Sequence, residues 1–258
     1  SSASTGRHAT PHTMSDSLAD RITEHLGTVA RLRALREVDA GLAHRVHEVK
    51  RYQAARFERT YADLLSNPRY EGAARFFLQD LYGPQEFADR DAQFGRIVPA
   101  LVRLFPGEIV ETVEQLGRLH ALTEALDDAL ARQLPGLPAD AATYAQAWQS
   151  SGRAPGREQQ IALTLGIGAA LDRYTRNRLL RSSLKLMRGP AQAAGLGDLQ
   201  RFLERGFDAF GAMKGAGEFL AWVGQRERAL VTALFAPGAV AAAGLPRAQR
   251  PDPLDQLP

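Results

Sequence analysis

The chain of 258 residues contains no cysteine and has little excess of charge of either sign, with 32 basic and 29 acidic residues. Without cysteine it forms no disulfide, has no thiolate nucleophile and offers no cysteine ligand to a metal. A net charge of +3 is too small to indicate a nucleic-acid-binding protein, although a pI near 9.4 leaves an anionic partner open. With 45% hydrophobic and 24% charged residues, the composition is that of a soluble globular protein.

Long hydrophobic runs are also missing. The longest apolar run, from Ile161 to Leu171, is too short to span a bilayer, and no secretory apolar segment follows the N-terminus. Residues 1–13 are polar and precede Met14, so we expect them to be a disordered leader outside the native domain. From these absences we expect a cytoplasmic protein without a transmembrane segment.

Several catalytic signatures are absent as well. The chain has no Gly-x-Ser-x-Gly elbow, no phosphate loop ending in Gly-Lys-Ser/Thr and no His-Glu-x-x-His, so the hydrolase, NTPase and zincin hypotheses lose their main support. Gly166 and Gly168 lack the third glycine of the dinucleotide fingerprint, because that position is Leu171. We therefore interpret Ala162, Gly166 and Ala170 as small residues that let another helix approach closely.

Proline beside glycine or asparagine divides the chain into segments with helical spacing, because proline cannot continue a helix and glycine tolerates its left-handed cap. Within the segments, apolar residues recur every three or four positions. The spacing predicts one bent helix or two helices over 18–52, and further helices over 69–82, 85–104, 107–133, 139–150, 157–188, 197–213 and 215–235. Pro99 alone falls inside a segment, where it should kink or split the helix.

No alternating strand pattern appears, so we expect an all-α protein, a multi-helix bundle of about eight to nine helices without a sheet. One helical domain should cover residues 14–235. Residues 236–258 hold five of the 14 prolines and no periodic stripe, so we expect a flexible Pro/Ala-rich tail.

The most distinctive stretch is RFFLQDLYGPQEFADRD, residues 75–91. With the residues before it, it forms a broad apolar helix face: Tyr70, Ala73, Ala74, Phe77, Leu78 and Leu81, extended by Phe76. Gly83 and Pro84 are typical of a helix end followed by a new start, so we interpret the stretch as a corner between packed helices. Its polar residues are the alternative, as candidates for a ligand site: Arg75, Asp80, Tyr82, Asp89, Arg90 and Asp91.

The string FFLQDLYGPQEF, followed by Arg-Asp, resembles the uncharacterised bacterial family named for its FFLEELY motif, from which it departs at Gln79, Asp80 and Gly83. The stretches DAF and MKGAGEFLAWVGQRERALVTALF near the C-terminus are also similar to that family. The resemblance covers roughly residues 18–235. It implies an α-helical protein of unestablished activity, and it assigns no catalytic residue.

Three histidines are weak candidates for metal ligands. His44 and His47 lie at positions i and i+3 beside Glu48, so they share one helix face. A third ligand would have to come from elsewhere: His120, Glu111 or Glu114. Carboxylate-bridged di-iron sites need Glu-x-x-His pairs, which this chain lacks. A solvated histidine pair is the commoner arrangement, so we expect no metal.

His120 lies beside a stripe of leucines and could ligate haem in a helical pocket. More commonly such a histidine lies at the boundary of the core and pairs with an acid, here Glu124, one turn further on. We therefore expect no cofactor.

The segment RYTRNRLLRSSLKLMR, residues 173–188, contains six basic residues and no acid. Arg178, Arg181, Lys185 and Arg188 fall on one helix face, which could bind phosphate groups of lipid or nucleic acid. Because the whole chain is nearly charge-balanced, we expect carboxylates of a neighbouring helix to neutralise this face.

Extensive apolar helix faces without a complete catalytic motif favour a non-enzymatic module that binds a protein partner or forms a homodimer. One alternative is a protein that binds an apolar or haem-like small molecule in a pocket between helices. The other is an enzyme that uses the polar residues of 75–91.

Overall fold

The computed structural model describes residues 11–81 and 91–258, and the side chains of 17–81 and 97–258. The described residues form thirteen α-helices and no strand, which confirms the predicted all-α fold. The helices are somewhat more numerous than expected. The leader predicted over residues 1–13 is described only from Pro11, where the first helix begins.

The first half of the chain contains α1 (Pro11–Glu37), α2 (Ala40–Thr60), α3 (Ala62–Leu65), α4 (Glu71–Phe76), the π-helical turn η1 (Phe77–Leu81), α5 (Asp91–Leu104) and α6 (Gly107–Gln133). The second half contains α7 (Ala141–Ser151), α8 (Ala154–Arg176), α9 (Arg178–Leu186), α10 (Arg188–Ala193), α11 (Gly197–Met213), α12 (Gly217–Phe235) and α13 (Ala239–Ala243). Two 3-10 turns follow, η3 (Arg247–Gln249) and η4 (Leu254–Gln256).

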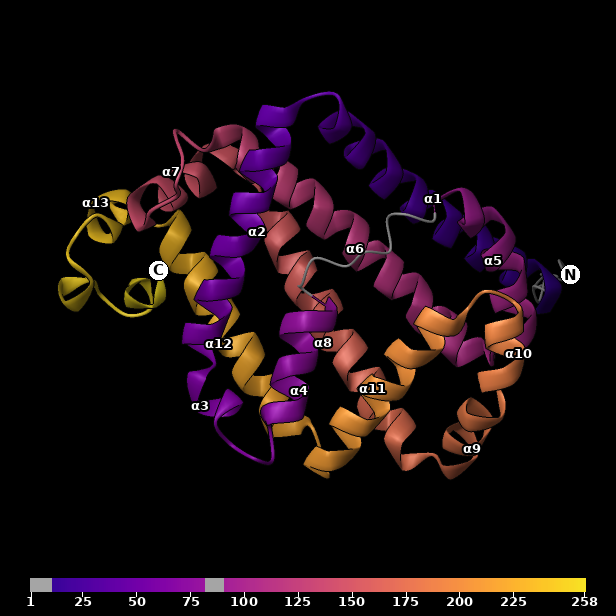
Figure 1. Ribbon diagram of the computed structural model, residues 1–258. Helices are drawn as coiled ribbons and strands as arrows, with labels where there is room; N and C mark the ends of the chain where they lie inside the picture. Colours follow the sequence, from indigo (N-terminus) through magenta and orange to yellow (C-terminus); the bar gives the residue numbers. More distant parts are fainter. Residues whose placement is uncertain (1–10, 82–90) are drawn as a thin grey trace, which may run out of the picture.

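The helices α6 and α8 pack against each other in the middle of the bundle, and the other long helices surround them (Figure 1). Helices α1 and α2 pack on α6, whereas α11 and α12 pack on α8. Helix α5 packs on α1, α4 on α11, and α13 on α7. None of the described helices combines the length and the apolar character needed to cross a bilayer.

The larger of two hydrophobic clusters is built around the motif FFLQDL. Phe77 is fully buried, and its ring lies 5.8 Å from that of Phe210 and 5.3 Å from that of Phe219. All the positions predicted for the apolar face are buried: Tyr70, Ala73, Ala74, Phe76, Phe77, Leu78 and Leu81. The motif therefore supplies core side chains, as its spacing indicated. Gly83 and Pro84, the predicted corner, lie outside the described residues.

One predicted helix boundary is corrected, and two open alternatives are decided. The segment 157–188 is divided at Asn177, whose side chain caps α9 by accepting hydrogen bonds from the Leu179 and Leu180 amides at 3.1 Å. The first segment forms two helices, which is one of the two predicted forms, and α2 is capped by the Asp39 side chain, which accepts from the Leu42 amide at 3.0 Å. Helix α5 continues through Pro99 without being split.

The close helix approach lies at Gly168, not at the small residues that we expected. A Cβ at Gly168 would lie 2.6 Å from Leu220 Cδ2, so α8 and α12 meet so closely there that a side chain would require Leu220 to shift. Ala162 and Gly166 are exposed instead.

Residues 236–258 pack against the domain, which differs from the flexible tail expected from the sequence. Leu254 is 3% exposed and Leu257 is fully buried, both in the second hydrophobic cluster. The backbone is bonded as well, since Arg59 Nη1 donates to the Leu257 carbonyl at 2.8 Å and Tyr52 donates to the Pro258 carbonyl at 3.2 Å. The sequence pattern did not indicate this packing, because the buried leucines are isolated and do not recur at helical spacing.

Candidate functional site

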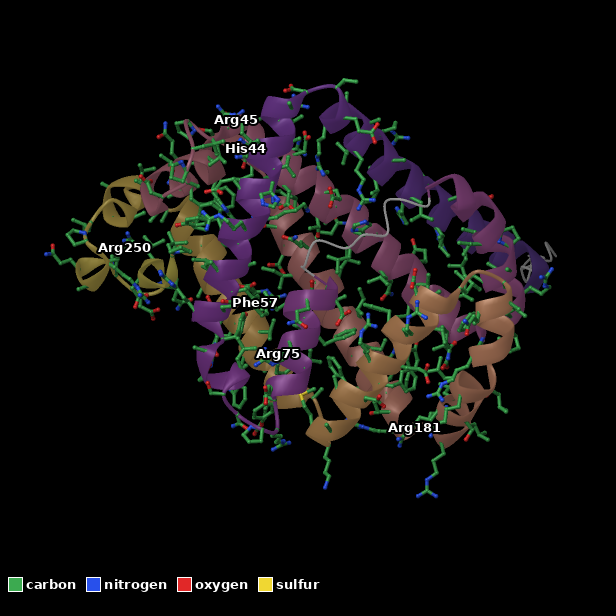
Figure 2. The ribbon with its side chains drawn as sticks, viewed as in Figure 1. His44, Arg45, Phe57, Arg75, Arg181 and Arg250 are labelled. Carbon is green, nitrogen blue, oxygen red and sulfur yellow. The ribbon has the colours of Figure 1, made fainter. Side chains whose placement is uncertain are left out.

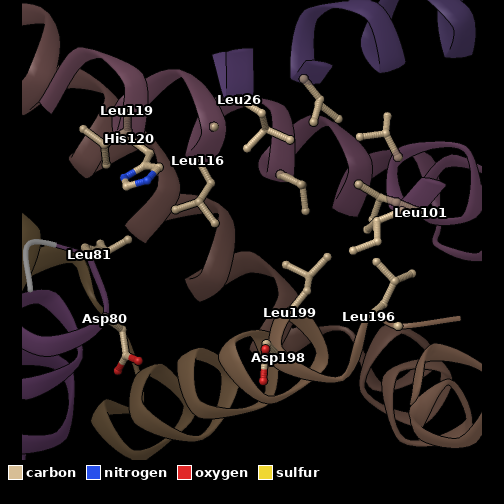
Figure 3. Close-up of a pocket in the computed structure, with 16 residues that line it drawn as sticks. Leu26, Asp80, Leu81, Leu101, Leu116, Leu119, His120, Leu196, Asp198 and Leu199 are labelled. Atoms are coloured by element: carbon tan, nitrogen blue, oxygen red, sulfur yellow. The ribbon is translucent and has the colours of Figure 1, made fainter. Parts of the chain in front are cut away.

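An apolar pocket of about 130 Å³ lies between α1, α5, α6, η1 and α11. Most of its wall is aliphatic, with leucines from several helices around one space (Figure 3): Leu26, Leu101, Leu116, Leu119, Leu196 and Leu199. The pocket is therefore a space between the packed helices, lined by their side chains.

Helical spacing explains how the wall forms. On α1, Ile22 and Leu26 are one turn apart, and on α6 Val113, Leu116 and His120 follow at intervals of three and four. Each helix thus presents one continuous side to the pocket. The leucines of α6 were part of the predicted apolar stripe, but the pairing of that stripe with α11 could not be derived from the sequence.

The polar groups in the wall carry little net charge. Asp80 accepts from Arg205 Nη2 at 2.6 Å, and Asp198 pairs with Arg201. Burial is the main cause that lowers the pKa of His120, to about 4. The negative charge of Glu124 raises this pKa, whereas the positive charges of Arg33, Lys50 and Arg36 lower it further. The imidazole is therefore neutral at pH 7.

Next to His120, the buried acids of α6 are occupied by cations. Glu124 pairs with Arg36 and with Lys50, whose Nζ lies 2.9 Å from Glu124 Oε1 and 2.8 Å from Asp127 Oδ2. Burial alone would raise the pKa of Glu124, but Lys50 and Arg36 lower it to about 2. The acid expected to pair with His120 is thus bound by two other residues, and it acts on the ring through its charge.

The polar residues of the 75–91 motif do not meet in the described part of the chain. Arg75 pairs with Glu71 at 3.0 Å on the surface of α4 (Figure 2), and Asp80 pairs with Arg205. The remaining candidates are not placed: Tyr82, Asp89 and Arg90 lie outside the described residues, and Asp91 begins α5 with a side chain outside them. Asp80 and Leu81 instead contribute to the apolar pocket.

The histidine candidates lie apart. His44 and His47 are exposed on α2, whereas His120 lies in the pocket wall on α6. The acids proposed as further ligands are also dispersed, since Glu111 is exposed and Glu114 Oε1 lies 3.0 Å from His25 Nε2. Within the described residues, no three histidine or carboxylate side chains gather where they could hold a metal ion.

The basic face on α9 is only partly neutralised. Arg188 pairs with Glu204 at 2.5 Å, as the charge balance led us to expect. Arg178, Arg181 and Lys185 are exposed, and no carboxylate of the described residues forms an ion pair with them. Figure 2 shows Arg181 at the edge of the bundle. Two leucines of the same helix, Leu179 and Leu186, are 80% and 78% exposed.

The chain matches the family model of a domain of unknown function, DUF8198, over residues 32–240. No curated protein and no solved structure matches it. The matched range takes in α5, α6, η1 and α11, four of the five elements around the apolar pocket, and also the basic helix α9. Since that range covers most of the helical bundle, the chain belongs to the DUF8198 family.

Proposed function

We propose that this protein is a binding module that holds a neutral apolar small molecule, or the apolar end of a larger one, in the pocket between α1, α5, α6, η1 and α11. The observation that supports it is an aliphatic pocket of about 130 Å³. An engineered cavity of about 150 Å³ lined by Leu, Ile and Phe binds benzene. A benzene-sized group or a short acyl segment therefore suits this pocket.

The charges around the pocket support an uncharged ligand. Both carboxylates in the wall, Asp80 and Asp198, are paired with arginines. His120 is neutral at pH 7 and so leaves no cation for a ligand anion.

A haem-like ligand, the second form of the pocket hypothesis, is less well supported. The volume is that of a single aromatic ring, and a porphyrin is several times larger. We therefore assign His120 to the wall of an apolar pocket and not to an iron centre.

Native mass spectrometry of the full chain, purified without detergent, tests the proposal. We expect an adduct that is removed by organic extraction and identified as a neutral apolar compound. If the purified protein shows no adduct, and incubation with toluene produces none either, the proposal is wrong.

A second candidate function rests on α9. Leu179 and Leu186 are seven residues apart, and so are Arg178 and Lys185, so two apolar and two basic side chains form neighbouring exposed stripes. Leucines beside basic residues are typical of helices that lie on anionic membranes, because the leucines enter the acyl boundary and the cations contact phosphates. We propose that α9 contacts an anionic lipid surface in this way. Nucleic acid is less suited, because it offers exposed leucines no apolar region.

A further inference from the structure

Helix α9 contacts the bundle along one side only. Leu184 is the one buried residue of its nine, and Leu180 on the same side is half-buried. The Leu184 carbonyl also accepts a hydrogen bond from Gln200 Nε2 of α11 at 2.6 Å. Because successive helical residues are about 100° apart, the residue opposite Leu180 and Leu184 is Ser182. Ser182 is exposed and therefore lies at the centre of the side that faces away from the bundle.

Three cations surround Ser182 at distances of about one helical turn or less. Arg178 lies four residues before it and Lys185 three residues after it, so both share its side of the helix. Arg181 precedes it and lies one turn from both of these cations. All three cations are exposed, and no carboxylate of the described residues forms an ion pair with them. Arg188 is different, because a carboxylate of α11 already balances its charge.

This serine–cation cluster, Arg178, Arg181, Ser182 and Lys185, has the donors that a phosphate group needs. A guanidinium group can bind two phosphate oxygens, an ammonium group acts as a point charge, and a hydroxyl can donate one further hydrogen bond. A phosphomonoester offers three acceptor oxygens and a charge of about −1.5 to −2 at pH 7, and nearby cations favour its more charged form. A phosphodiester carries a single negative charge and has fewer free oxygens. Three unpaired cations therefore suit a phosphomonoester better.

The exposed leucines of α9 indicate where that phosphate comes from. Leu179 and Leu186 are 80% and 78% exposed. They lie three residues before and four residues after Ser182, on the side of it that is opposite the cations. A membrane lipid offers an acyl boundary to the leucines and a phosphate to the cations, whereas a soluble phosphate ester leaves the leucines in water. The arrangement therefore favours a lipid head group.

We propose that α9 recognises membrane lipids whose head group is a phosphomonoester, and that the serine–cation cluster is the head-group site. The inference rests on the lipid contact proposed for α9 and narrows its partner to one class of head group. The phosphate would lie beside the Ser182 hydroxyl, and the acyl chains would contact Leu179 and Leu186.

Co-sedimentation of the full chain with two kinds of vesicle tests the inference. One kind contains phosphatidic acid, a phosphomonoester, and the other phosphatidylserine, a phosphodiester, both diluted in phosphatidylcholine to equal zeta potential. We expect the chain to bind the phosphatidic acid vesicles at least roughly tenfold more tightly. Soluble glycerol 3-phosphate, at the concentration of the lipid head group, should not displace the chain, because it leaves the leucines in water.

Two pairs of matched variants separate head-group recognition from attraction by charge. Ser182→Ala keeps the net charge, so it should weaken binding to phosphatidic acid roughly threefold and leave binding to phosphatidylserine unchanged. Ser150→Ala, at an exposed position of α7, should alter neither. Arg181→Gln should weaken binding to phosphatidic acid more than to phosphatidylserine. Arg153→Gln removes an exposed cation at the opposite end of α8 from α9 and should alter neither.

The outcomes distinguish the head-group site from the lipid contact on which it rests. Equal affinity for the two vesicles, or an unchanged preference in Ser182→Ala, overturns the head-group inference and leaves the lipid contact standing. Displacement by glycerol 3-phosphate also overturns it, because the phosphate would then be bound without a membrane. If the chain binds neither kind of vesicle, the lipid contact and the head-group inference both fail.

Discussion

Gly168 on α8 faces Phe77 on the π-helical turn so closely that a Cβ at Gly168 would lie 3.2 Å from Phe77 Cζ. The same Cβ would lie 2.6 Å from Leu220 Cδ2, so α8, η1 and α12 share this contact. The glycine thus lets the FFLQDL motif and the two helices pack around one point.

We expect Gly168→Ala to destabilise the protein, whereas Gly166→Ala should not. Overpacking a core costs about 1–3 kcal/mol, whereas replacing glycine with alanine inside a helix gains roughly 1 kcal/mol. The net effect of Gly168→Ala should therefore be a loss of stability of up to about 2 kcal/mol. Gly166 is exposed and has nothing closer than 3.9 Å to its Cβ position, so it should show only the gain. Urea unfolding of both variants measures the difference. Equal stabilities would mean that the contact tolerates a methyl group.

The pKa of His120 predicts a pH dependence of stability. It is about 4 in the folded chain, against 6.5 for the free side chain, so the unfolded chain binds the proton more readily between these values. Stability should therefore be full above pH 6.5 and fall as the pH drops from 6.5 toward 4, by up to roughly 2–3 kcal/mol from this residue. His120→Gln should flatten the profile of the free energy of unfolding in this window. Parallel profiles for the two proteins would contradict the assignment.

The C-terminal packing predicts that Leu257 stabilises the fold. Leu257→Ala removes a fully buried side chain, so the free energy of unfolding should fall by about 2–5 kcal/mol. Leu245→Ala, at a residue 40% exposed, serves as the control and should cost much less. Calorimetric melting of both variants checks this, and a Leu257→Ala protein that melts like the original would restore the flexible-tail expectation.

The basic helix α9 predicts binding to anionic vesicles. Changing Arg181 and Lys185 together to Gln should weaken co-sedimentation with phosphatidylserine vesicles at least roughly tenfold, since each cation near such a surface contributes about 1 kcal/mol. Stability should barely change, because both side chains are exposed. Changing Leu179 and Leu186 to Gln should also weaken binding. Unchanged co-sedimentation, or no preference over phosphatidylcholine, would remove α9 as a lipid contact.

Proline and glycine at helix ends explain which helices could be predicted. Helices α6 and α11 have the predicted bounds, 107–133 and 197–213, because Pro-Gly pairs or glycines mark their ends. The break at Asn177 was missed because it depends on a side-chain cap without proline or glycine. Residues 254–257 were missed because isolated leucines bury themselves without a helical repeat.

The candidate sites could be predicted only in part. The leucine stripe of α6 and the core role of Phe77 follow from spacing alone. The complete pocket wall does not, since Leu116 and Leu199 are 83 residues apart by number and meet only through the packing of the helices. Likewise, the exposure of Leu179 depends on which side of α9 faces its neighbours.

Calorimetric titration with toluene tests the central claim, that the pocket beside His120 binds an apolar molecule. We expect one toluene per chain with a negative heat-capacity change. Leu199→Phe fills the pocket and should abolish binding, whereas Leu35→Phe, at an exposed position of α1, should bind like the original chain. No toluene binding by the original chain, or undiminished binding by Leu199→Phe, would contradict the account.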